Sequence, residues 1–154
     1  MKPTAVVVVA AALLCVPGIG SGLEPGDATQ HARDDVAAEL SQCAAYYVLV
    51  AAKIEASDFP GPDRNKGVAQ AKQASQIAIG MAAQLSSADV AAARMEVARQ
   101  TMEGEMKNDW GKFSLIAVRY MRSCKDIVER PDERLVYWLK EKSKLQDVPP
   151  AKPK

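Results

Sequence analysis

Histidine is almost absent from this 154-residue sequence, which limits the chemistry to be expected of it. The one histidine, His31, lies in a polar stretch before the first predicted helix. A serine or cysteine nucleophile needs a base beside it, and no G-x-S-x-G occurs after residue 22. Zinc sites, c-type haem and di-iron bundles need several His or Cys ligands. We therefore predict no catalytic residue, no metal site and no cofactor, and we expect that the protein is not an enzyme.

Two weaker chemistries stay open as alternatives. His31 with Asp34 and Asp35 is either a weak metal site or a solvated helix start, and the second interpretation is favoured. A carboxylate pair for glycoside chemistry is the other alternative. The acidic residues that cluster in sequence are Glu96, Glu103, Glu105 and Asp109. Basic residues lie among them, at Arg94, Arg99 and Lys107. This mixture favours an ordinary ion-pair face of a helix.

An excess of charge of one sign is also lacking. The whole sequence holds 20 Lys and Arg residues against 19 Asp and Glu residues. Residues 1–22 contain Lys2 and no acid, so the chain without them has 20 − 1 = 19 basic and 19 acidic residues. A chain with no net charge has no overall attraction for nucleic acid or for an anionic membrane. We predict no nucleic-acid partner.

The longest hydrophobic run of the sequence is at the N-terminus. There, one lysine precedes an apolar run over residues 5–16, which a Pro-Gly pair ends. Gly20 and Gly22 are small residues at the −3 and −1 positions of a signal-peptidase site. The run is too short to cross a bilayer as a helix. We therefore predict a signal peptide over residues 1–22, export to the periplasm or the exterior, and no transmembrane segment after cleavage.

Two details of this segment have alternatives. A cut after Ala28, with Gly26 at −3, also fits the pattern. Cys15 would carry lipid in a bacterial lipoprotein, but such a cysteine follows a small residue and Leu14 is bulky. We therefore predict that Cys15 is discarded with the signal peptide.

Few cysteines remain after cleavage, namely Cys43 and Cys124. An even pair in an exported chain indicates a disulfide, because thiols oxidise outside the cytosol. Closing the ring between them would contribute about 4.5 kcal/mol to stability by chain entropy. Two buried free thiols are the alternative. We predict the disulfide.

Signals for β-structure are lacking too. Aromatic residues make up 5% of the sequence, and no Asn-Gly or Asp-Gly pair joins two alternating runs. Alanine is abundant, and apolar residues recur at helical spacing. We predict an all-α bundle of four to five helices over residues 34–146, stapled by one disulfide, between a polar lead-in (23–33) and a disordered tail (147–154). The expected helices span about residues 34–56, 65–85, 86–107, 110–129 and 131–146.

Both cysteines fall on apolar stripes, which predicts that they face the core and can meet. The stripe of the first helix is Val36, Leu40, Cys43, Tyr47, Val50 and Ile54. That of the fourth is Phe113, Ile116 or Ala117, Tyr120, Cys124, Ile127 and Val128. The second helix has a stripe of mostly small residues, which favours close helix approach: Val68, Ala71, Ser75, Ala78, Ala82 and Leu85. The apolar side of the last helix is Leu135, Trp138, Leu139 and Leu145.

Polar residues mark the expected helix starts. Asp63 can cap the second helix after a Pro-Gly-Pro stretch. Ser86 followed by Asp89 resembles a capping box for the third. Asn108 or Asp109 can cap the fourth helix within "KNDWGK". We predict a break there, with a kinked continuous helix as the alternative.

Methionine is the remaining unusual feature. The residues concerned are Met81, Met95, Met102, Met106 and Met121. They can form a soft binding surface or hold copper(I) through their thioethers. They can also fill gaps between helices, and their helical spacing favours this second role.

The stretch "LSSADVAAARMEVARQTMEGEMK" resembles the helical hairpins of small periplasmic stress chaperones, in which L-T-x-x-Q precedes Met-rich helices. Its own start is L-S-S-A-D, without the threonine and glutamine, and we do not assign the family. By elimination, we expect an exported, non-enzymatic protein that binds an unknown protein partner. The alternative is a bundle that carries a ligand or metal on its methionines. A binding surface would be an exposed apolar patch, with Tyr46, Leu49, Val136 and Tyr137 as its candidates.

Overall fold

The computed structural model describes residues 25–146, which form five α-helices and one short 3₁₀ helix, with no strand among them. The elements are α1 Pro25–Glu55, α2 Gly61–Leu85, α3 Ala88–Glu105, η1 Trp110–Lys112, α4 Phe113–Glu129 and α5 Pro131–Gln146. The predicted all-α bundle is confirmed. The predicted signal peptide with Cys15, the predicted tail over 147–154 and the side chain of Leu145 lie outside the described part.

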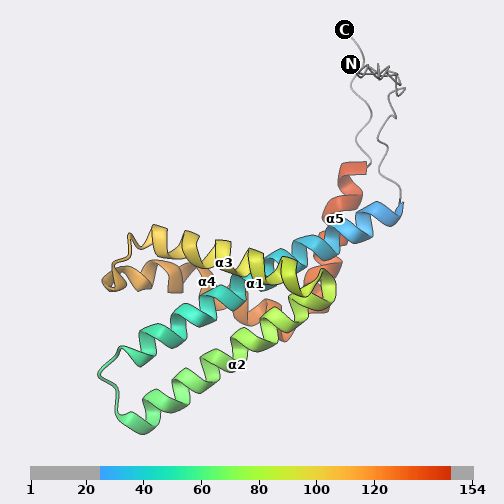
Figure 1. Ribbon diagram of the computed structural model, residues 1–154. Coiled ribbons are helices and arrows are strands. Elements are labelled where there is room, and N and C mark those ends of the chain that lie inside the picture. Colours follow the sequence, from blue (N-terminus) through green and yellow to red (C-terminus); the bar gives the residue numbers. More distant parts are fainter. Residues whose placement is uncertain (1–24, 147–154) are drawn as a thin grey trace, which may run out of the picture.

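Helix α1 is the centre of the bundle. It contacts α2, α3, α4 and α5. α1 and α2 form a long antiparallel hairpin, α3 and α4 form a shorter one, and α5 lies along the N-terminal part of α1 (Figure 1). Neighbours therefore cover α1 on several sides. Tyr46 and Leu49, predicted as members of an exposed patch, are only 4% and 2% exposed, so that prediction is wrong.

Helix α1 also begins earlier than predicted. Residues 25–33, expected to be a polar lead-in, form its first turns. The predicted start at Asp34 is therefore wrong, and ion pairs join α5 to α1 just after it, at Asp35 and Glu39. Ala32 is fully buried, and Asp35 forms an ion pair with Lys142 of α5. Asp34 and Asp35, an acidic pair that is typical of a helix start, therefore lie inside the helix.

The α1–α2 hairpin packs through small residues, as predicted. Ala71, Ser75, Ala78 and Ala82 are the buried residues of α2. Ser75 Oγ donates a hydrogen bond to the carbonyl oxygen of Ala44, 3.0 Å away on α1. Near the loop that joins the two helices, a Cβ on Gly67 would lie 3.3 Å from Cγ2 of Ile54. Small side chains thus let the two backbones approach closely.

The predicted core stripes bring the two cysteines together. On α1, Val36, Leu40 and Cys43 are buried, and on α4 the buried residues are Ile116, Cys124 and Ile127. Cys43 and Cys124 form a disulfide with a Cα–Cα distance of 5.2 Å. The predicted disulfide is confirmed, and it ties the central helix to the second hairpin.

The helix boundaries differ from the prediction by small shifts. α2 begins at Gly61 and has no side-chain cap, so Asp63 lies in its first turn instead of capping it. The cap of α3 is Ser87, whose hydroxyl accepts from the Val90 N–H. Ser86, the predicted cap, instead donates to the Ala82 carbonyl at the end of α2.

The break between the third and fourth helices is confirmed. Lys107 and Asn108 have φ values of 53° and 56°, in the left-handed region that ends a helix. Asp109 then caps η1 by accepting a 2.9 Å hydrogen bond from the Gly111 N–H. The chain reverses at this point, which lets α4 return along α3 (Figure 1).

Candidate functional site

The residues considered for metal binding do not gather into a site. Asp35 is engaged by Lys142, whose Nζ lies 2.6 Å from Oδ2. Asp34 accepts a hydrogen bond from Gln30 on the same helix. Among residues 25–146, no three His, Cys, Asp or Glu side chains are placed to hold one metal ion.

The acidic cluster of α3 forms the predicted ion-pair face. Arg99 pairs with Glu96 at 2.7 Å and with Glu103 at 2.6 Å. The hydrogen bonds from Arg99, with one from Gln100, lower the pKa of Glu96 to about 2. Glu105 pairs with Arg119 of α4 at 2.6 Å. These carboxylates hold helices and arginines in place, and the lowered pKa of Glu96 makes it a poor proton donor.

The methionines are divided between core and surface. Met102 and Met106 are each 1% exposed. Met81 and Met95 are half-buried against the same core, whereas Met121 is 62% exposed. This arrangement favours the packing role over a continuous thioether surface.

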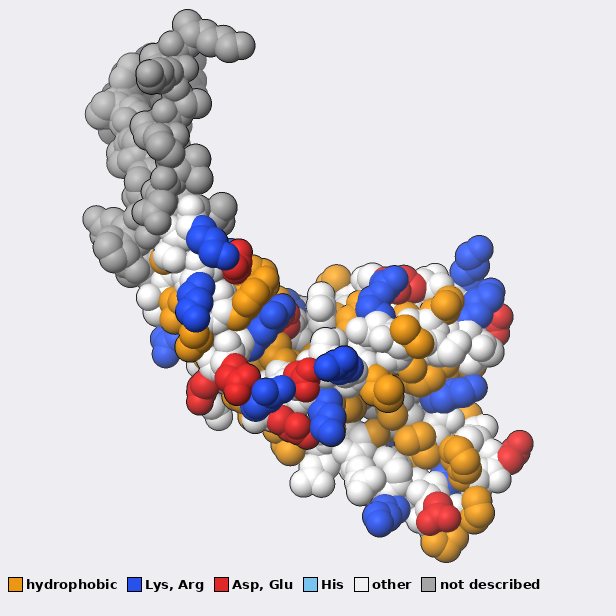
Figure 2. Space-filling view, turned by 180° about the vertical axis from the view of Figure 1, so that it is seen from behind, with side chains coloured by type: hydrophobic (Ala, Val, Ile, Leu, Met, Phe, Trp, Pro, Cys, Tyr) orange, Lys and Arg blue, Asp and Glu red, His pale blue; other side chains and the backbone are white. Residues whose placement is uncertain are grey.

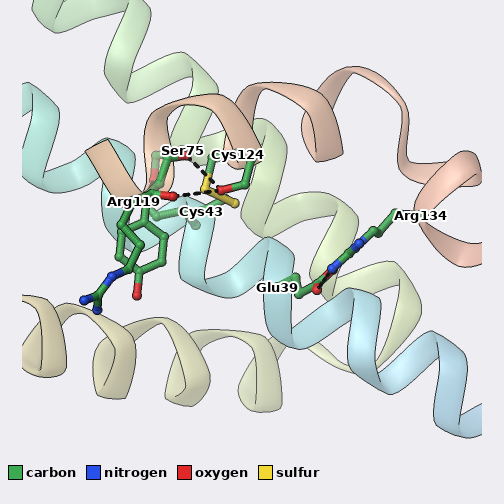
Figure 3. The surroundings of a disulfide bond; sticks show 9 residues. Glu39, Cys43, Ser75, Arg119, Cys124 and Arg134 are labelled. Carbon is green, nitrogen blue, oxygen red and sulfur yellow. Dashed lines mark hydrogen bonds and ion pairs between the residues drawn. A yellow bond between two sulfur atoms is a disulfide. The ribbon is translucent and has the colours of Figure 1, made fainter. Parts of the chain in front are cut away.

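A groove of about 480 Å³ lies between α1, α4 and α5, and the disulfide forms part of its lining. Its principal lining residues are Glu39, Gln42, Arg119, Tyr120, Arg130, Arg134 and Tyr137. Figure 3 shows the disulfide between the helices, Ser75 beside it, and Glu39 paired with Arg134 farther along α1. The lining comes from three helices that are far apart in sequence, which is why no local motif indicates the groove.

Ion pairs fix the walls of this groove. Arg134 on α5 donates two hydrogen bonds to the carboxylate of Glu39 on α1. Its pKa is raised, chiefly by these bonds to Glu39. Arg130 joins Asp126 of α4, at 3.3 Å, to Glu133 of α5, at 3.1 Å. Acidic and basic side chains lie next to one another on the face seen in Figure 2.

A second hollow, of about 370 Å³, adjoins the first on the α3 side of α1. The two hollows share Gln42 and Tyr120 in their linings. The remaining lining of the second is mostly apolar: Ala38, Ala93, Arg94, Val97, Ala98, Thr101 and Met102. Arg94 crosses from α3 to α1, where it donates to the Asp34 carbonyl at 3.3 Å. We call the two adjoining hollows together the α1 groove, with an apolar half and a polar half.

Opposite charges balance one another in the polar half of the α1 groove. The arginines of the polar half each face a carboxylate, so neither sign of charge is in excess. Gln42 is exposed, and its amide makes no hydrogen bond within the described residues. An unused amide beside an apolar hollow can pair with a peptide group while an aliphatic side chain fills the hollow.

Compared with known protein families, curated proteins and solved structures, the chain shows no significant match. Within residues 25–146, no helix has both the length and the apolar content that a membrane span requires. The site is therefore interpreted from its own geometry.

Proposed function

We propose that this is an exported, non-enzymatic binding protein whose α1 groove holds a segment of a protein partner. The observation that carries the proposal is the junction at Gln42 and Tyr120, where an apolar hollow meets a polar one. Their volumes of about 480 and 370 Å³ lie in the range typical of ligand sites. A groove with an apolar and a polar half fits a peptide, which carries backbone amides together with apolar and polar side chains.

A covalent link between two walls of the groove supports this proposal. The disulfide joins α1 to α4 beside the groove, and Arg134 joins α5 to Glu39. A groove formed before binding avoids much of the ordering cost of association. The disulfide is also compatible with an oxidising compartment, and the N-terminal signal pattern supports export.

Export is tested by the mass of the protein recovered from the cell envelope of its host without reductant. We expect the mass of residues 23–154 less two hydrogens, from signal cleavage and disulfide formation. A mass that retains residues 1–22, or one increased by lipid on Cys15, would contradict soluble export.

Peptide binding is tested by selecting a phage-displayed random peptide library on the oxidised protein. We expect enriched peptides that share an apolar residue, and we expect Gln42→Trp to weaken their binding about tenfold or more because the indole fills the junction. Gln76→Trp, an exposed change on α2 outside both hollows, is the matched control and should bind normally. Enriched peptides that bind both variants equally, or a selection without enrichment, would overturn the proposal.

A further inference from the structure

The outer surface of α4, on a different side of that helix from the α1 groove, carries large apolar side chains that nothing covers. Leu115, Val118 and Met121 are 58%, 84% and 62% exposed. Arg122 and Lys125 are exposed on the same helix. We call these five residues the α4 outer surface. Side chains of this size are normally buried by something.

These five residues lie on one side of the helix. Leu115, Val118, Arg122 and Lys125 follow the spacing i, i+3, i+7, i+10, which keeps them near a single line along the helix. Met121 lies on an adjoining line. The apolar and the basic side chains can therefore contact the same flat surface at the same time. Figure 2 shows hydrophobic side chains next to Lys and Arg side chains on the face seen from behind.

The surface is locally basic although the chain as a whole is neutral. Residues 112–125 contain Lys112, Arg119, Arg122 and Lys125 and no acid, and α4 ends with Asp126, which pairs with Arg130, and Glu129. Arg119 and Lys112 are paired with Glu105 and Asp109. Arg122 and Lys125, by contrast, form no ion pair within the described residues. Salt screens surface charges from one another beyond about 8 Å at physiological ionic strength. Acids farther away on the molecule therefore do not cancel the attraction of Arg122 and Lys125 for negative charge.

The shape and the charge of the α4 outer surface indicate what kind of partner can bind to it. A ridge on a single helix, with Val118 projecting most, suits a flat surface. A second copy of the chain is disfavoured, because pairing the ridge with itself would oppose its basic residues. Trp110, 39% exposed and stacked on Phe113, lies just before α4, and aromatic residues of this kind favour the bilayer interface.

We propose that the α4 outer surface docks on an anionic lipid bilayer. Leu115, Val118 and Met121 enter the boundary between headgroups and acyl chains, and Arg122 and Lys125 face the lipid phosphates. The helix lies in the plane of the interface and does not cross the bilayer. This inference is independent of the proposed peptide function, since none of these five residues lines the α1 groove.

The test is flotation of the oxidised protein with vesicles of phosphatidylglycerol and, separately, of phosphatidylcholine. We expect binding to phosphatidylglycerol that salt weakens, and little binding to phosphatidylcholine. Arg122→Gln with Lys125→Gln should weaken binding about 30-fold, since each surface charge contributes about a factor of five. Val118→Ser with Met121→Ser should weaken it about tenfold or more by removing apolar contact.

The matched control is Val136→Ser with Lys140→Gln, which makes the same kinds of change at exposed positions of α5. It should bind like the parent protein, and all three variants should keep the parent's melting temperature because the altered side chains are exposed. Equal binding to both lipids, no binding, or unchanged binding by the α4 variants would overturn the proposal. So would a dimer in sedimentation that the α4 variants abolish, since a second copy would then be the occupant.

Discussion

The two buried serines of this bundle each donate a hydrogen bond to a backbone carbonyl. Ser41 and Ser75 are the buried polar residues among those described. Ser41 donates to the Ala37 carbonyl of its own helix at 2.8 Å. Ser75 instead donates across the α1–α2 interface to Ala44. The serine on the predicted stripe of α2 therefore has a bonding role as well as a small size.

We expect Ser75→Ala to lower the free energy of unfolding by about 1 kcal/mol, the net contribution of one hydrogen bond. Ser75→Leu should cost about 1–3 kcal/mol, because the closely packed hairpin has no space for the larger side chain. Urea unfolding followed by circular dichroism measures both. Ser123→Ala, on an exposed hydroxyl of α4, is the control and should change little. An effect of Ser75→Ala as small as that of the control would contradict the assigned role.

The pKa of Glu96 offers a second test at the residue scale. With Arg99 donating to it, the carboxylate should titrate at about pH 2. Because this folded-state pKa lies below the unfolded value, the stabilisation is present above the ordinary pKa of Glu and is lost as the pH falls toward 2. Arg99→Gln should raise the pKa toward the ordinary value, as followed by NMR of the side-chain carboxyl. An unchanged titration in that variant would mean that the ion pair does not persist in solution.

At the scale of elements, α5 is attached to α1 through charge as well as through apolar contact. Arg134, Trp138 and Lys142 recur every four residues on α5. The two cations flank the indole, at 5.5 and 5.3 Å from its centre, and pair with Glu39 and Asp35 on α1. Ion pairs of this partly exposed kind contribute little each, so α5 should be among the less stable elements.

We expect Arg134→Gln with Lys142→Gln to loosen α5 without unfolding the α1–α2 hairpin. Amide hydrogen exchange in α5 should accelerate about tenfold, as for a loss of roughly 1.4 kcal/mol in local stability. Exchange in α2 should not change. Lys140→Gln with Lys144→Gln alters exposed α5 positions and serves as the control. Equal acceleration in α2 and α5 would show that the helices open as one unit.

At the scale of the whole molecule, net charge proved a poor guide to local surfaces. The chain as a whole is neutral, yet on α4 the basic residues Arg122 and Lys125, which form no ion pair within the described residues, lie beside exposed apolar ones. α4 has three basic residues against two acids, and one of those acids, Asp126, is paired with Arg130. Because screening limits each charge to its own neighbourhood, the distribution of charge matters more than its sum.

The disulfide supports the molecule as a whole by joining the central helix to the α3–α4 hairpin. Its cysteines are 81 residues apart in sequence. We expect Cys43→Ala with Cys124→Ala to lower the free energy of unfolding by about 2–4 kcal/mol while the helices persist. Urea unfolding with and without reductant measures this. Reductant should destabilise the parent protein and leave the double variant unchanged; no effect on the parent would mean that the bond does not contribute.

Local patterns in the sequence were sufficient to predict the helices and the inward direction of the stripes of α1, α2 and α4. On α3, by contrast, Val90 and Val97 are exposed, and Ala91, Ala98 and Met102 are buried. Helical hydrogen bonds and apolar periodicity both act within a few residues. For that reason the small-residue stripe of α2, the break at Asn108 and the meeting of Cys43 with Cys124 could be predicted. The capping serine was misplaced by one position, because adjacent serines offer the same hydroxyl.

Only the tertiary structure decided which faces of the helices stay open. Tyr46 and Leu49 are buried because α1 has neighbours on several sides. The α1 groove brings Gln42 and Tyr120 together from helices distant in sequence. Burial depends on neighbours that no local pattern specifies. The sequence by itself therefore determined the elements of this protein, and their packing determined its surfaces.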